Sequence, residues 1–218
     1  EYQLFLNIIK KLNIPIFYTP GNRDNRKNLT SIFTHSYLTD SEKGIFIYSS
    51  NFAKFRLVSF DTSCDRNNQE EITIEKLNIF SKILNKEKNI PTVIFMHHPP
   101  FHVGIPSLDR LGLGSDGDKI GDAISIYSNI RHIFFGHVHR PISGSWRGIP
   151  YSSLRGINHQ VPLDFKSIEV VPKSHEPPAY AVVFLENNQT TVHFHDYLDT
   201  YRVSYNKKSE GRPDWVRL

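Results

Sequence analysis

Three short segments carry side chains that could bind metal ions, and each follows a run of apolar residues. They are residues 21–24 (Gly-Asn-Arg-Asp), residues 97–98 (His-His) and residues 136–139 (Gly-His-Val-His). Imidazoles together with an amide oxygen favour Mn, Fe, Zn or Co over Ca or Mg. In a turn, His137 and His139 can point to different ions, and paired ions in such sites lie about 3.5–4 Å apart. We interpret the glycine that opens the first and third segments as permitting a tight turn.

The elements that must position these segments are predicted from the hydrophobic periodicity. Helices are expected at residues 5–12, 70–85 and 120–127, a polar loop at 61–69 and a long loop at 101–118. Strands are expected at residues 16–18, 45–48 and 55–60 (joined by a turn at 49–51), 92–96, 131–135, 149–152, 168–171, 179–185 and 190–194, the last two joined by a turn at 187–188. This order predicts a single α/β domain with a second sheet. Because strand ends of α/β sheets meet at one edge, the three segments should converge there.

Composition excludes several classes of protein. The chain has 218 residues, a net charge of +4 and a single cysteine, Cys64. A disulfide framework is therefore excluded, and a reducing compartment, the cytoplasm, is expected. No apolar run approaches the roughly 20 residues that a membrane-spanning helix needs. Nucleic-acid binding is not expected, because the basic residues are scattered along the chain; Cys64 itself is interpreted as a packed thiol rather than a nucleophile.

The order of the three motifs, G-N-[HR]-D, H-H-P-P and G-H-V-H, resembles that of the calcineurin-like metallophosphoesterase superfamily. Residues 136–141, 154–161 and 194–196 narrow the resemblance to the class III cyclic nucleotide phosphodiesterase and glycerophosphodiesterase branch. The resemblance implies a four-layer α/β/β/α sandwich of two mixed sheets flanked by helices. It also implies hydrolysis of a small phosphodiester by metal-bound hydroxide, two divalent ions and a homodimer. The metallophosphoesterase domain is expected over residues 1–205, followed by a polar tail at 206–218.

The resemblance also assigns metal ligands. Asn22, His97 and His137 match ligands of the second metal, and His139 matches a ligand of the first. His159 resembles a contact to the substrate phosphate, with an ordinary polar loop residue as the alternative.

The remaining site residues carry catalytic expectations. His98 is expected to make a hydrogen bond or to face the substrate, the alternative being a residue that stabilises the turn before Pro99. Arg23 stands where the family more often has histidine, and arginine stays charged at any working pH. We assign Arg23 to phosphate binding and charge stabilisation, leave the general acid open, and note pairing with Asp24 as the alternative. Asp61 is interpreted as a loop anchor.

The family places an Asp-x-His motif and a Gly-Asp motif before the G-N-x-D motif. Only 20 residues precede Gly21, and they contain neither aspartate nor histidine. The further ligands of the first metal, the bridging carboxylate and the N-terminal strands are therefore missing from this sequence. Because the sequence begins with Glu1 and not with methionine, we expect it to be the C-terminal part of a longer enzyme. The alternative is a non-catalytic remnant that binds at most one metal weakly.

Overall fold

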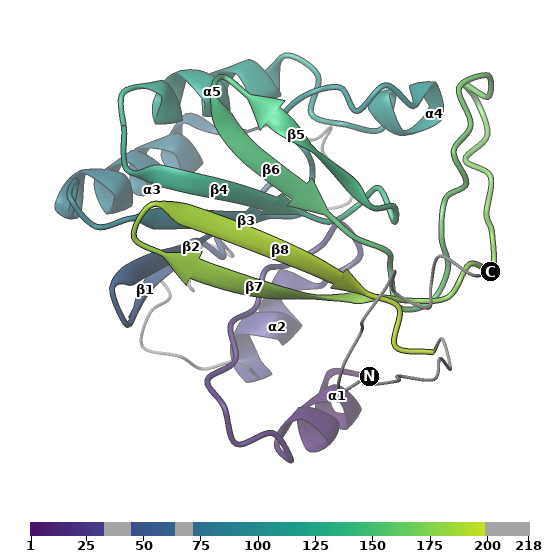
Figure 1. Ribbon diagram of the computed structural model, residues 1–218, viewed down its shortest axis with the longest axis horizontal. Helices are drawn as coiled ribbons and strands as arrows, with labels where there is room; N and C mark the ends of the chain where they lie inside the picture. Colours follow the sequence, from purple (N-terminus) through teal and green to yellow (C-terminus); the bar gives the residue numbers. More distant parts are fainter. Residues whose placement is uncertain (33–44, 64–71, 199–218) are drawn as a thin grey trace, which may run out of the picture.

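The computed structural model describes residues 1–32, 45–63 and 72–198, which form an α/β fold with two sheets (Figure 1). The larger sheet has six strands in the order β1-β2-β3-β4-β6-β5. Its strands are β1 (Tyr48–Phe52), β2 (Phe55–Phe60), β3 (Thr92–Met96), β4 (Ile130–Phe135), β5 (Ile142–Trp146) and β6 (Ile149–Ser153). Strands β2, β3, β4 and β6 are parallel, whereas β1 and β5 are antiparallel to their neighbours. The sheet is therefore mixed, as expected.

The second sheet is the antiparallel hairpin of β7 (Tyr180–Glu186) and β8 (Gln189–His195), joined at the expected turn. Helices α3 (Ile74–Lys86) and α5 (Asp116–Ser125) pack side by side over one face of the larger sheet (Figure 1). The hairpin lies over the other face, where β8 contacts β4. Helices α1 (Tyr2–Ile9), α2 (Arg26–Ile32) and α4 (Pro106–Asp109) complete the described elements. The predicted α/β architecture with two sheets is confirmed.

The main core lies between the larger sheet and the two covering helices. Val58, Ile94 and Ile133 are fully buried there, against Phe80 of α3 and Ile120 of α5. Strand β3 reads Thr-Val-Ile-Phe-Met without alternation, as is typical of a parallel strand covered on both faces. In the described part of the chain, no helix is both long enough and apolar enough to cross a membrane.

The pairing register explains why polar segments meet at one edge. Phe60 of β2 lies beside Met96 of β3, and Met96 lies beside Phe135 of β4. All three strands therefore end at the same level, and the residues that follow them are neighbours in space.

Two predicted strands are absent. Residues 16–18 form no ladder with the described strands; Tyr18 donates its N–H to the Tyr48 hydroxyl, which donates to the Tyr18 carbonyl. Residues 168–171 are also not a strand, and Arg110 donates to the carbonyls of Ile168 and Glu169 instead. In both segments, at least one backbone group is hydrogen-bonded to a side chain instead of to a strand.

Strand β5 was not predicted from the sequence. It pairs with β6 through a turn at Arg147 and Gly148, whose φ angles are 50° and 80°. Left-handed backbone at both central residues matches the tight hairpin turn that joins adjacent antiparallel strands. The Arg-Gly pair is a weaker signal than Asn-Gly, which is why the turn was missed.

Several boundaries also differ from the predictions. The first helix ends at Ile9, and the β1–β2 turn lies at residues 53–54 and not at 49–51. The expected loop at 101–118 contains α4 and the start of α5. Helix α3 begins after Thr73, whose side chain accepts a hydrogen bond from the Lys76 amide. Cys64, residues 64–71 and the predicted tail at 206–218 lie outside the described residues.

Candidate metal centre

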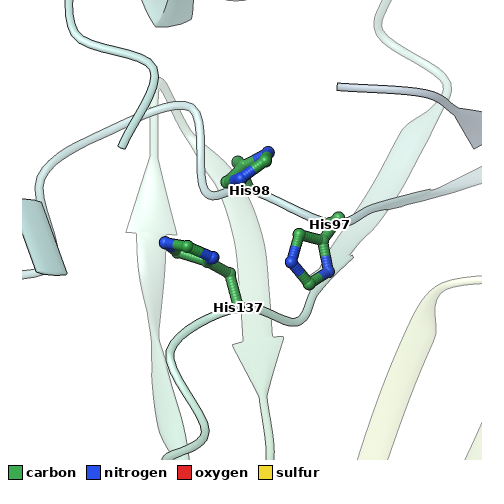
Figure 2. A group of neighbouring side chains, drawn as sticks. All are labelled: His97, His98 and His137. Carbon is green, nitrogen blue, oxygen red and sulfur yellow. The ribbon is translucent and has the colours of Figure 1, made fainter. Parts of the chain in front are cut away.

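Three histidines from the ends of two adjacent strands form a compact group. His97 and His98 follow β3, and His137 follows β4 by way of Gly136, which donates its N–H to the His97 carbonyl at 3.0 Å. The ring centroids lie 4.7 Å apart for His97–His98, 5.2 Å for His97–His137 and 4.5 Å for His98–His137. One nitrogen from each ring lies within 4.8 Å of the others, and Figure 2 shows the rings around a common space.

The turn after β4 sends its two histidines in different directions. His137 and His139 have φ angles of 63° and 48°, and Val138 donates its N–H to the Gly136 carbonyl at 2.6 Å. This hydrogen bond closes a γ-turn centred on His137, a strained conformation. His137 consequently joins the histidine group, whereas His139 packs against His159 with ring centroids 4.4 Å apart. The two rings thus have different nearest aromatic neighbours, while the binding of each to a different ion stays a prediction.

The glycines of the first and third motifs serve a purpose other than the one expected. Neither Gly21 nor Gly136 has a positive φ angle. A Cβ atom on Gly21 would lie 3.1 Å from two atoms of the His97 ring, and one on Gly136 would lie 3.3 Å from its Nδ1. Glycine at both positions therefore lets the backbone approach the imidazole closely. The same contacts place the first motif directly beside the histidine group.

Burial keeps the three imidazoles neutral. It lowers the pKa of His97 to about 3, of His98 to about 2 and of His137 to about 4, and neighbouring histidines add to the effect. Neutral imidazole is the form that binds metal ions. The Nε2 atoms of His97 and His137 are buried and accept or donate no hydrogen bond among the described residues. Bound metal would satisfy both atoms, so the residues fit the divalent ions that the family resemblance implies.

His98 makes the hydrogen bond expected of it. Its Nδ1 lies 3.1 Å from the Thr62 Oγ1, which also accepts the His98 backbone N–H at 3.0 Å. The side chain is fully buried, and its Nε2 is buried in the same histidine group. Thr62 therefore fixes the orientation of this ring, a contact that a structural residue before Pro99 would also make, and the geometry makes His98 a candidate ligand beside His97.

The first motif forms a loop around Asn22, which is half-buried. Arg23 is exposed and makes no ion pair with the residues of ranges 1–32, 45–63 and 72–198. The alternative pairing with Asp24 is not formed; Asp24 accepts hydrogen bonds from the Gly21 N–H and the Tyr2 hydroxyl instead. The Arg23 guanidinium thus points its charge into solvent beside the loop.

Asp61 anchors a loop, as predicted. Its partner, Arg26, was not predicted from the sequence. Asp61 forms a buried ion pair with Arg26 and accepts the Ser63 N–H. Arg26 stands two residues after the G-N-R-D motif, but no feature of the sequence links it to a position 35 residues away.

His139 and His159 form a second pair of stacked rings, and His139 is near enough for its charge to lower the pKa of His97 and of His137. The His139 Nδ1 donates to the His159 carbonyl at 2.7 Å, which leaves its Nε2 as the nitrogen able to bind metal. Burial and the charges of His139 and Lys173 lower the pKa of His159. Gln160 holds this loop by accepting from the Gly156 N–H and donating to its carbonyl. His159 is therefore held next to a predicted metal ligand.

Comparisons with known proteins agree with this site. The family model for calcineurin-like phosphoesterases matches residues 1–141. A probable cyclic nucleotide phosphodiesterase of Rhodopseudomonas palustris is 30% identical, over 94% of this chain and 79% of its own length. A probable glycerophosphodiester phosphodiesterase of Arcobacter nitrofigilis is 27% identical, over 96% of this chain and 78% of its own length. A dimetal phosphatase from Danio rerio shares the fold, with a TM-score of 0.60 at 14% identity, over 88% of this chain and 73% of the other.

Proposed function

Because the chain belongs to the calcineurin-like phosphoesterase family, whose members hydrolyse phosphoester bonds, we propose that it cleaves small phosphodiesters of the cyclic nucleotide or glycerophosphodiester type. The observation that carries the proposal is the pair of neutral, half-buried imidazoles of His97 and His137, whose Nε2 atoms are buried and which meet at adjacent strand ends beside Gly21. The names of the relatives from R. palustris and A. nitrofigilis support the choice of diesters.

Asn22, His97 and His137 would hold one divalent ion, and His139 would contribute to a second. Mn, Fe, Zn and Co all suit these donors. A bound ion supplies Lewis acidity, which stabilises charge on the phosphoryl oxygens and lowers the pKa of coordinated water. His98, oriented by Thr62, adds a neutral nitrogen to the same group.

Two side chains would bind the phosphate. Arg23 carries a permanent charge beside the Asn22 loop and can donate two parallel hydrogen bonds to phosphate oxygens. That charge can stabilise the transition state but cannot supply a proton to the leaving oxygen. His159, only partly exposed and stacked on His139, would donate a hydrogen bond from the other side.

The test is metal-dependent hydrolysis of bis-p-nitrophenyl phosphate. His137→Ala removes one of the two buried nitrogens, so turnover should fall to the background rate. His193→Ala, which replaces an exposed histidine on β8, is the matched control and should retain full activity. Unchanged turnover in the His137 variant would refute the assignment.

A second candidate function is a non-catalytic domain that binds at most one metal. It is favoured by the composition of the histidine group, which contains no carboxylate among the described residues. Metal content measured by mass spectrometry separates the two: one ion or none per chain favours the non-catalytic domain, and two ions favour the enzyme.

Partners and location complete the proposal. We propose a homodimer that acts in the cytoplasm on a small phosphodiester and does not bind nucleic acid. The single cysteine supports a reducing compartment, and the dimer rests on the family resemblance. Light scattering of the purified chain tests the dimer, since a monomer mass of 25.2 kDa would contradict it.

A further inference from the structure

A buried ion pair connects the loop of the first motif to the end of β2. Arg26 and Asp61 are 7% and 1% exposed. The Arg26 Nε and Nη2 donate to the two carboxylate oxygens of Asp61 at 3.1 and 2.7 Å. The guanidinium therefore grips the carboxylate with two parallel hydrogen bonds, which fixes its orientation as well as its position.

The third nitrogen of the same guanidinium holds the metal-binding loop. Arg26 Nη1 donates to the Gly21 carbonyl at 3.0 Å and to the Asp24 carbonyl at 2.7 Å. These two carbonyls lie on either side of Asn22 and Arg23 in the chain. Because the Asp61 carboxylate is fixed at the end of β2, the guanidinium that it binds holds the loop at a fixed place relative to that strand end.

Asp61 also belongs to a series of three residues that hold the site. Thr62 orients the His98 ring, and the Ser63 carbonyl accepts a hydrogen bond from Lys76 of α3 at 2.6 Å. The end of β2 thus contacts the loop, the histidine group and a helix through consecutive residues.

We propose that the Arg26–Asp61 pair is a positioning device that sets metal affinity, by holding the Asn22 loop against His97. This inference rests on the proposed function for the identity of the ligands. A buried ion pair is often no more stabilising than apolar residues of similar volume, so stability alone does not account for this pair. Its hydrogen bonds to the loop around Asn22 favour a positioning role. Groups that orient metal ligands contribute about 10–100-fold to metal affinity.

The first test measures Co²⁺ affinity of the full chain by calorimetry and by its visible absorption. Arg26→Lys keeps the charge but cannot reach the carboxylate and both carbonyls together, so Co²⁺ should bind about 10–100-fold more weakly. Arg56→Lys is the matched control. Arg56 is also buried and lies at the opposite end of β2, where it donates to Thr92 and to the Ile83 carbonyl. Its variant should lose stability and keep the parent's Co²⁺ affinity and spectrum.

The Arg26→Met/Asp61→Leu double variant separates positioning from folding. Apolar replacement of both partners restores packing without the hydrogen bonds to the Gly21 and Asp24 carbonyls and from the Ser63 N–H, so the variant should fold, unfold at a midpoint above that of Arg26→Met alone, and bind Co²⁺ weakly. Parental affinity in this variant or in Arg26→Lys would overturn the proposal. Should the parent bind Co²⁺ but fail to hydrolyse the diester, the proposed function would fail while the positioning role would remain measurable.

Discussion

His132 should make the metal-free protein sensitive to mild acid. It lies in β4, is 5% exposed, and its Nε2 is 3.0 Å from the Ser152 hydroxyl oxygen. Its ring stacks on Phe134 with centroids 4.3 Å apart. Burial lowers the pKa of His132 from 6.5 to about 4, so the imidazole is neutral in the folded protein at pH 7.

The sign of the effect follows from proton linkage. Between pH 6.5 and 4 the unfolded chain binds a proton at this residue and the folded protein does not. The stability that His132 contributes is therefore present above pH 6.5 and is lost as the pH falls toward 4. At pH 5 the loss amounts to about 2 kcal/mol from this residue, a large part of the 5–15 kcal/mol typical of a domain.

Urea unfolding at pH 7.5 and pH 5.0, with a chelator present, measures this loss. His132→Asn does not titrate in this range and retains a side-chain amide that can bond Ser152. Because the site histidines titrate alike in both proteins, their contribution cancels from the comparison. The variant should lose about 2 kcal/mol less than the parent on acidification. Equal losses in the two proteins would show that His132 is not held neutral by burial.

Two glycine substitutions test the fold and the site separately. In Gly117→Ala the new Cβ would lie 2.1 Å from the Pro100 carbonyl oxygen, so the free energy of unfolding should fall by about 3 kcal/mol; an unchanged urea midpoint would contradict this packing. In Gly156→Ala the new Cβ would lie 2.7 Å from the His139 Nδ1, displacing that ring. Diester turnover should then fall about 100-fold, with a smaller change in stability, and full turnover would show that the position of His139 does not matter.

The features predicted most reliably from the sequence were those that follow from the pairing of parallel strands. His97 and His137 were expected to meet because each follows an apolar strand, and the register of β3 and β4 brings their ends level. The G-H-V-H segment also forms the turn that was considered for it, with positive φ angles at His137 and His139. These features depend on local pattern and on the general geometry of α/β sheets, so a single sequence contains them.

Contacts between distant residues were beyond the same reasoning. Arg26 and Asp61 are 35 positions apart, and Thr62 and His98 are 36 apart. Neither pair has a periodicity or spacing that would link its members. The hydrogen bonds between the Tyr48 hydroxyl and the Tyr18 backbone, at the end of the strand expected at residues 16–18, also join positions 30 apart.

Gly21 and Gly136 were correctly singled out as parts of the motifs, but the physical reason expected for them was wrong. Gly136 was expected to carry the tight turn, yet the left-handed backbone falls on His137 and His139, where a side chain adds strain. Strained residues of this kind cost about 1–3 kcal/mol each and persist only when surrounding contacts hold them. Here the His159 carbonyl holds the His139 ring, and the closeness of Gly136 to His97 holds the turn against the neighbouring strand end. Because strained residues cluster at functional sites, the backbone at His137 and His139 supports the metal site that we propose there.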